Sequence, residues 1–183
     1  MPKTTESTKS EILNWCKDNN ITAIVPTRDG ELLFWANWKL ELLSNGIKVM
    51  VPNEHAVEAC LDKLLFSSSC RKLNLPAINS DLKIENCEFN FFVVKERYGA
   101  GSQSIAINVD KESALKHSET LENPLFQPFV PGSEISVDSY ITESGIVKGI
   151  VTRFRSVVDK GESVITETFF NETLNNQLLE IIK

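Results

Sequence analysis

The sequence predicts a mixed fold, in which a small parallel α/β layer comes first and an antiparallel α+β region follows. Near the N-terminus, short β-branched segments alternate with segments of helical periodicity, which is typical of parallel strands joined by helices. Toward the C-terminus, strand-like segments follow one another across short turns, as in antiparallel hairpins. The chain has 183 residues, of which 42% are apolar and 24% charged, so it is long enough for one sizeable core or two small lobes.

The first lobe begins with a predicted helix over residues 7–19, because apolar side chains recur there at helical spacing, namely Ile12, Trp15 and Cys16, with Ser7 and Ser10 as possible caps. A strand is expected at 21–25. The next helix opens at residues 29–31 and ends at Asn45-Gly46. We expect its apolar face to hold Leu32, Leu33, Trp35, Ala36, Leu40 and Leu43. A second buried strand at 47–51 then precedes a further helix.

The second half is predicted to be antiparallel. Two strands, at 89–95 and 104–109, flank a glycine-rich loop, and a polar helix follows at 111–121 with Ala114, Leu115 and Leu121 turned inward. Three further strands joined by hairpin turns are expected at 134–142, 146–155 and 163–170. The chain ends in a predicted helix at 174–182.

Composition excludes several classes of partner. The net charge is −6 and the chain has no basic stripe, which argues against nucleic-acid binding and against an acidic membrane surface. No apolar run approaches the roughly 20 residues that a membrane span needs. The cysteines are far apart and form no CxxC pair, which argues against zinc and predicts reduced thiols in the cytoplasm: Cys16, Cys60, Cys70 and Cys87.

Lys95 is the most informative single residue. It ends an apolar strand and is followed at once by the loop Glu96-Arg97-Tyr98-Gly99-Ala100-Gly101-Ser102. A strand that delivers a cation, followed by glycines whose amide N–H groups can turn toward an anion, predicts a phosphate site. The alternative is an edge-strand lysine beside a plain hairpin turn. Neither a GxxxxGK[ST] nor a GxGxxG motif is present.

A second anchor follows at residues 125–134, Leu-Phe-Gln-Pro-Phe-Val-Pro-Gly-Ser-Glu. It belongs to a longer pattern that runs from Gln127 through Gly132 and Glu134 to Asp138 on a strand. Two prolines alone would also explain the segment as a rigid linker. The order of lysine, glycine loop and acidic segment nevertheless resembles the nucleotide site of ATP-grasp proteins, closest to the carbamoyl-phosphate-synthase-like and carboxylate–amine ligase branch.

The resemblance runs from about Ile21 to the C-terminus and implies a three-part organisation. Residues 1–61 would be a partial pre-ATP-grasp α/β lobe, residues 62–126 the small lid subdomain, and residues 127–183 part of the large ATP-grasp subdomain. In the family, a glutamate and a Glu-x-Asn pair on later strands bring Mg²⁺ to the site, and this chain stops before them. The resemblance therefore implies a protein that is truncated at both ends or divided between genes.

The resemblance also implies roles for individual residues. The phosphates would be held by Lys63, Lys95, Gly99, Ala100, Gly101 and Ser102. Adenine would lie against Gln127, Phe129 and Val130, and Glu134 would bind the ribose. Catalytic cations would be Arg153 and Arg155, and one Mg²⁺ ligand would be Glu167.

Three of these roles have a plain structural alternative. Lys63 follows an expected helix cap and could simply be solvated. Arg153 and Arg155 lie two apart on one strand face and could pair with Asp159 or Glu162. Glu96 stands where the family commonly has proline, and we expect it to pair with cations beside Lys95.

Two functions remain open at this point. In the first, the chain is the ATP- and Mg²⁺-binding part of an enzyme that activates a small carboxylate as an acyl phosphate for ligation to an amine. In the second, it is a non-catalytic nucleotide-binding or partner-binding module. In both cases the chain could pair with the missing segments or self-associate.

Overall fold

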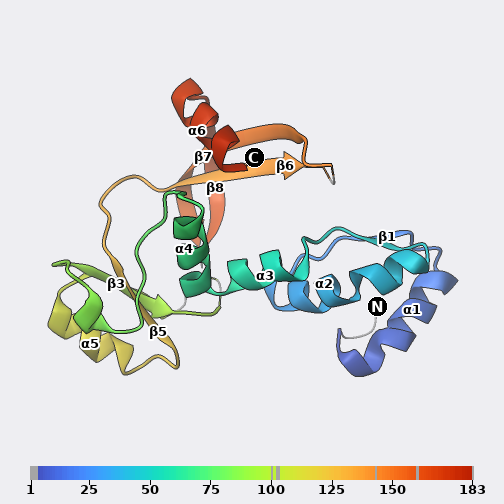
Figure 1. The fold of residues 1–183 in the computed structure, drawn as a ribbon, viewed down its shortest axis with the longest axis horizontal. Helices are drawn as coiled ribbons and strands as arrows, with labels where there is room; N and C mark the ends of the chain where they lie inside the picture. Colours follow the sequence, from blue (N-terminus) through green and yellow to red (C-terminus); the bar gives the residue numbers. More distant parts are fainter. Residues whose placement is uncertain (1–3, 100, 102–103, 143, 160, 183) are drawn as a thin grey trace. The chain divides into compact units, whose positions relative to one another are not determined.

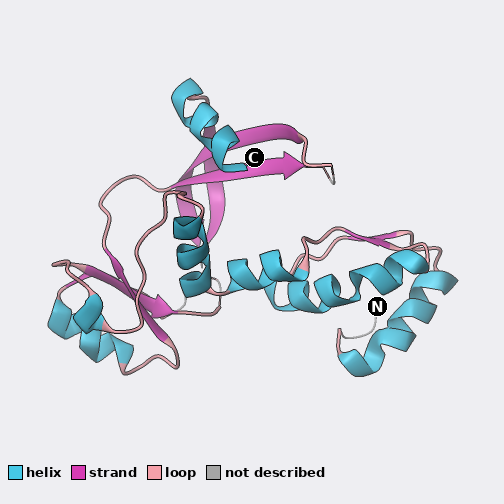
Figure 2. Ribbon diagram, in the orientation of Figure 1, coloured by secondary structure: helices cyan, strands magenta, loops and turns pink. Residues whose placement is uncertain are grey.

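The structure is a computed structural model that describes every residue except 1–3, 100, 102–103, 143, 160 and 183. The chain divides into two compact units, Met1–Ser69 and Cys70–Lys183, and each is described by itself (Figures 1 and 2). The boundary falls inside helix α4 (Lys63–Lys72). The three-part organisation implied by the family resemblance stays a prediction. No helix in the described part of the chain is both long and apolar enough to cross a membrane.

The first unit is a small α/β layer, as predicted. Its elements are η1 (Glu6–Thr8), α1 (Lys9–Asp18), β1 (Ala23–Ile24), α2 (Asp29–Ser44), β2 (Lys48–Val49), α3 (Glu54–Leu61) and the start of α4. Strands β1 and β2 pair in parallel, with Ala23 opposite Lys48. The Asn53 side chain caps α3 by accepting the Ala56 N–H at 2.8 Å.

The core of this unit is formed by one face of α2 against α1 and the two strands. Trp35, Trp38 and Leu42 are buried, and the Trp35 and Trp38 rings stack at 6.0 Å. The predicted face was partly wrong, because Leu40 is 79% exposed and Leu43 49% exposed. Helix α2 is apolar on nearly all sides, so helical periodicity alone does not predict which side is buried. The buried side is the one that carries Trp35 and Trp38.

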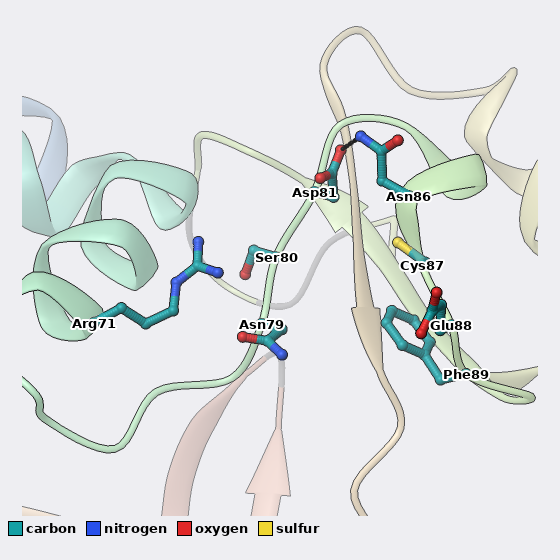
Figure 3. Close-up of a pocket in the computed structure, with 8 residues that line it drawn as sticks. All are labelled: Arg71, Asn79, Ser80, Asp81, Asn86, Cys87, Glu88 and Phe89. Atoms are coloured by element: carbon teal, nitrogen blue, oxygen red, sulfur yellow. Dashed lines mark hydrogen bonds between the residues drawn. The ribbon is translucent and has the colours of Figure 1, made fainter.

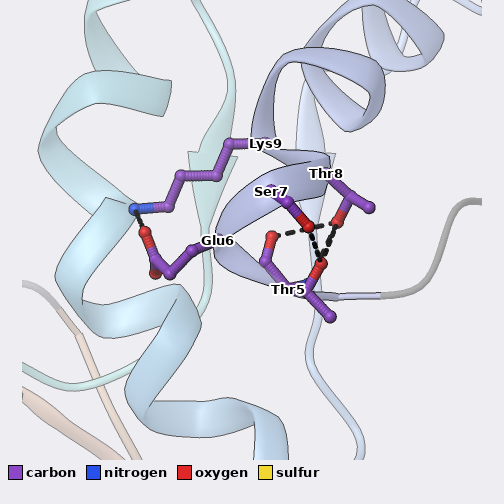
Figure 4. Close-up of polar contacts among 5 residues, drawn as sticks. All are labelled: Thr5, Glu6, Ser7, Thr8 and Lys9. Carbon is purple, nitrogen blue, oxygen red and sulfur yellow. Dashed lines mark hydrogen bonds and ion pairs between the residues drawn. The ribbon is translucent and has the colours of Figure 1, made fainter.

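The N-terminal helix begins at Lys9 rather than at Ser7. Lys9 forms an ion pair with Glu6 at 2.8 Å (Figure 4). The Lys9 ammonium also lies 5.7 Å from the centre of the Trp38 ring. The hydroxyls of Thr5 and Thr8 lie 3.0 Å apart, and Thr8 accepts the Thr5 N–H, which closes the preceding turn. The turn before the helix therefore depends on the Thr5–Thr8 pair.

The second unit starts with a three-stranded sheet that we call the lid sheet, in the order β4 (Ala106–Val109), β3 (Phe92–Glu96), β5 (Pro124–Pro128). All its pairs are antiparallel. Helix α5 (Lys111–Ser118) contacts β3 and β4, and η2 (Ile84–Asn86) precedes β3. Strand β5 was not predicted from the sequence, because it has a proline at each end and proline argues against a strand. Leu115 was expected inside but is 42% exposed.

The rest of the second unit is an antiparallel sheet of β6 (Ile135–Ile141), β7 (Val147–Asp159) and β8 (Glu162–Phe169), followed by α6 (Glu172–Ile182). Consecutive strands pair, as the turn residues predicted. The rings of Phe154 and Phe169 stack at 4.3 Å across β7 and β8. Thr152 is buried, and its hydroxyl donates to the Phe169 carbonyl.

Candidate functional site

Lys95 and Gln127 lie on the same face of the lid sheet. In the β3–β5 register, Val93 is opposite Gln127 and Lys95 is opposite Leu125, and residues directly opposite share a face. The other face carries a small apolar core, formed by Ile84, Phe92, Val94, Ala114 and Phe126. Because side chains alternate along a strand, the half-buried Lys95 points away from this core.

The Gln127 side chain is held in a buried position by a residue that sequence reasoning missed. It is only 8% exposed, and its Nε2 donates to Ser80 Oγ at 2.7 Å. Asp81 pairs with Phe126 through two backbone hydrogen bonds of 2.9 and 3.0 Å, so this segment runs along the edge of β5. Ser80 precedes Gln127 by 47 residues, and no local pattern connects the two.

Glu96 was expected to pair with cations, and the structure shows its carboxylate bound by backbone amides. Its Oε1 accepts the Glu122 N–H at 2.7 Å and its Oε2 accepts the Asn123 N–H at 2.9 Å. The backbone N–H of Arg97 also donates to the Asn123 carbonyl, at 2.8 Å. The end of β3 is thus tied to the start of β5 beside Lys95, and the acid is occupied by backbone amides.

The glycine loop leaves β3 directly after this clamp. Gly99 and Gly101 have φ angles of +102° and +77°, a region that favours glycine. The Arg97 guanidinium lies 5.1 Å from the centre of the Tyr98 ring. The other two residues proposed for the phosphates, Ala100 and Ser102, lie outside the described residues.

After β5, the chain turns away through the segment proposed to hold adenine. The Phe129 N–H donates to the Phe91 carbonyl at 2.9 Å, which continues the β3–β5 pairing by one bond. Val130 is 61% exposed and follows directly. Val130 lies in the segment that connects the lid sheet to the β6–β7–β8 sheet.

Lys63 belongs to the first unit, where it is the first residue of α4. Asp62 caps that helix, because its Oδ1 accepts the N–H groups of Leu64 and Leu65 at 3.0 and 3.2 Å. The helix-cap interpretation of this segment is therefore confirmed for Asp62. The part of Lys63 in phosphate binding stays a prediction.

Arg153 and Arg155 lie on one face of the β6–β7–β8 sheet, as strand alternation predicted, and each pairs with an acid of the preceding hairpin. Arg153 Nε donates to Asp138 Oδ2 at 2.6 Å, and Arg155 pairs with Glu134. The alternative interpretation had named Asp159 or Glu162 as the partners, and the acids that the structure shows beside the arginines are Asp138 and Glu134. The hydrogen bond from Arg153 lowers the pKa of Asp138 below its ordinary value.

Glu167 lies on the opposite face of that sheet. It stands directly across from Phe154, whereas the neighbouring Arg153 is across from Thr168. The structure therefore does not bring Glu167 together with the two arginines. Across the described residues, no three His, Cys, Asp or Glu side chains gather as a metal site. The part of Glu167 as an Mg²⁺ ligand stays a prediction.

A polar hollow of about 410 Å³ opens beside the segment that precedes β3 (Figure 3). It is lined by Arg71, Asn79, Ser80, Asp81, Asn86, Cys87, Glu88 and Phe89. Asp81 Oδ1 accepts from the Lys83 N–H at 2.9 Å and from Asn86 Nδ2 at 3.1 Å, and these bonds lower the pKa of its carboxyl. Asp81 therefore stabilises this turn.

Solved structures with this fold include biotin carboxylases and a D-alanine–D-alanine ligase, by their descriptions. A biotin carboxylase from Campylobacter jejuni, in complex with β,γ-ATP, matches with a TM-score of 0.70 and 16% identity over 94% of this chain and 44% of its own. The biotin carboxylase domain of 2-oxoglutarate carboxylase from Hydrogenobacter thermophilus, with MgADP, ADP and bicarbonate, matches with a TM-score of 0.66 and 15% identity over 86% and 39%.

A D-alanine–D-alanine ligase from Bacillus anthracis matches with a TM-score of 0.65 and 18% identity, over 95% of this chain and 62% of its own. The chain thus spans less than two thirds of each of these three proteins. At such identities the likeness shows the fold alone. A search of curated proteins by sequence found no match.

A family model for the ATP-grasp domain matches residues 60–166, which is more than half of the chain. The matched range contains the lid sheet, the glycine loop and the arginine pair of β7. This chain belongs to the ATP-grasp family.

Proposed function

We propose that this chain binds ATP on the face of the lid sheet that carries Lys95. The observation that carries the proposal is the β3–β5 register, which puts Lys95 and Gln127 on one face, away from the apolar core. A cation for the phosphates and an amide for the base are thereby held on neighbouring strands. Such a pair suits a ligand that is anionic at one end and hydrogen-bonding at the other.

The phosphates would lie between Lys95 and the loop that follows it, with amide N–H groups of Gly99, Ala100, Gly101 and Ser102 directed toward them. Lys63 would supply a second cation. At the other end, Phe129 and Val130 would contact the base and Glu134 the ribose. Only Oε1 of Glu134 is engaged by Arg155 among the described residues, so Oε2 can still accept from a ribose hydroxyl.

The finer proposal is that the parent protein activates a carboxylate as an acyl phosphate for attack by an amine, in the manner of the carbamoyl-phosphate-synthase-like branch. Arg153 and Arg155 would then balance charge on the phosphoryl group or the carboxylate. The family membership supports this proposal. Mg²⁺ would supply further charge neutralisation at the phosphates when bound, and Glu167 is its proposed ligand.

A second candidate is a nucleotide-binding or partner-binding module without catalysis. Self-association, pairing with further ATP-grasp segments and a cytoplasmic location stay predictions for this chain.

Calorimetric titration with ATP and with ADP tests the proposal. The wild-type chain should bind both, and Lys95→Ala should weaken binding by about 1–3 kcal/mol, the range for a lost hydrogen bond to a charged group. Lys116→Ala, on the exposed side of α5, is the matched control and should bind as wild type does. Equal affinity in wild type and Lys95→Ala would remove this lysine from the site.

A further inference from the structure

Two consecutive hydrogen bonds connect the Gln127 side chain, at the edge of β5, to Ser80 and Ile78, which lie 47 residues or more earlier in the chain. Gln127 Nε2 donates to Ser80 Oγ at 2.7 Å, and Ser80 Oγ donates to the Ile78 carbonyl at 3.3 Å. Ser80 is 7% exposed and Gln127 is 8% exposed. Both side chains are therefore shielded from water, which would otherwise exchange with these partners.

The donor and acceptor roles in these two hydrogen bonds fix the orientation of the Gln127 amide. A carbonyl can only accept, so the single hydroxyl proton of Ser80 is used by Ile78. The Ser80 oxygen must then accept from Gln127, and only the NH₂ end of the amide can donate. The amide oxygen therefore points away from Ser80.

We propose that Ser80 is a positioning residue that sets the base selectivity of the nucleotide site, by holding the Gln127 amide with its oxygen toward the ligand. This inference rests on the proposed function, because it assumes that the base lies against the face shared by Lys95 and Gln127. An amide oxygen accepts from the 6-amino group of adenine. The 6-oxo group of guanine is itself an acceptor and would leave that oxygen unpaired.

Without the Ser80 hydroxyl, the hydrogen bond that distinguishes the two ends of the amide is lost, and the amide can rotate by half a turn. Gln127 would present either a donor or an acceptor, and the preference for a 6-amino purine would fall. A residue that only supports the fold behaves differently, because its loss weakens binding of all nucleotides by the same factor. The ratio of two affinities therefore separates the two roles.

The test measures the affinities of the full chain for ATP, for purine riboside 5′-triphosphate, which lacks the 6-amino group, and for GTP. Wild type should prefer ATP. In Ser80→Ala, the ratio of ATP affinity to purine riboside triphosphate affinity should fall about 3- to 10-fold, as for one buried hydrogen bond. Ser118→Ala also removes a hydroxyl that donates to a backbone carbonyl, that of Leu115, and should leave the ratio unchanged.

A second background makes the result specific to amide orientation. In Gln127→Glu, both ends of the side chain are acceptors, so adding Ser80→Ala should no longer change the ratio. If Ser80→Ala does not fold, Ser80→Cys, which has a weaker donor in nearly the same volume, should lower the ratio in its place, and Ser80→Thr should retain it.

The outcomes distinguish this inference from the function on which it rests. A wild-type chain that binds no nucleotide would remove both. ATP binding with an unchanged ratio in Ser80→Ala would remove the inference alone, and so would an equal fall of the ratio in the Gln127→Glu background.

Discussion

The Glu96 carboxylate accepts the backbone N–H of Glu122 at 2.7 Å, and these two residues are 26 positions apart in the chain. With the parallel bond to Asn123, this contact closes the loop that contains the glycines, β4 and α5. Lys95, the proposed phosphate ligand, lies immediately before the clamp. The acid that replaces the family's common proline is therefore a structural element of the lid sheet.

Glu96→Ala should lower the free energy of unfolding by about 1–3 kcal/mol, because two backbone N–H groups lose a charged acceptor. Glu96→Gln keeps one acceptor oxygen, so its free energy of unfolding should lie between that of Glu96→Ala and that of wild type. Urea unfolding followed by circular dichroism gives these values. Glu85→Ala removes an exposed carboxylate just before β3 and should change stability little. Equal stability of Glu96→Ala and wild type would show that water replaces the clamp without cost.

Gly99→Ala should destabilise the chain by roughly 1–3 kcal/mol, because a side chain at φ +102° is strained even though no atom lies within 4 Å of the added Cβ. ATP should also bind more weakly to this variant. The matched control is Gly149→Ala in β7, where there is equal space and no positive φ. Thermal unfolding and ATP titration measure both effects. Equal stability and equal ATP affinity of the two variants would contradict the prediction.

The Asp138–Arg153 pair should make stability depend on pH. The hydrogen bond from Arg153 lowers the pKa of Asp138 in the folded state, so the pair stabilises the fold fully above the unfolded value of about 3.9, and this contribution is lost as the pH falls through the lower folded value. Asp138→Asn should therefore be less stable than wild type near neutral pH, and the difference should shrink in acid.

Urea unfolding of wild type and Asp138→Asn at several pH values measures this difference. Asp159→Asn changes an exposed aspartate of the same strand and serves as the control. A stability difference between wild type and Asp138→Asn that stays constant from neutral pH into acid would show that Asp138 stabilises the fold by something other than its charge.

The chain by itself should not turn over ATP. Phosphoryl transfer needs Mg²⁺ held by carboxylates, and three of the four candidates accept hydrogen bonds within the protein: Glu96 from backbone amides, Glu134 from Arg155 and Asp138 from Arg153. Glu167 is the fourth candidate and would supply a single ligand. ADP release would be followed with Mg²⁺, ATP and a panel of amino acids, other carboxylates and bicarbonate. Steady turnover that Glu167→Gln abolishes would contradict the prediction and place a metal at that residue.

Local patterns in the sequence were sufficient for most elements. The α1 and α2 helices, the parallel pair of β1 and β2, and the hairpins of β6, β7 and β8 follow from periodicity and turn residues within about ten positions of each element. Strand β5 escaped, because its prolines suppress the strand pattern although they occupy only its two ends. The family was recognisable for the same local reason, since the lysine and the glycine loop are adjacent in the chain.

What the sequence by itself determined was the order of the elements and which residues share a face within a single strand. Arg153 and Arg155 are an example, because alternation with a period of two needs no knowledge of neighbouring strands. Only the tertiary structure decided which residues meet across strands. The register between strands placed Glu167 opposite Phe154 and away from the arginines, and the packing of distant segments brought Ser80 to Gln127. Such contacts depend on how the strands are shifted against one another, and that shift is set by burial over the whole unit rather than by any local pattern.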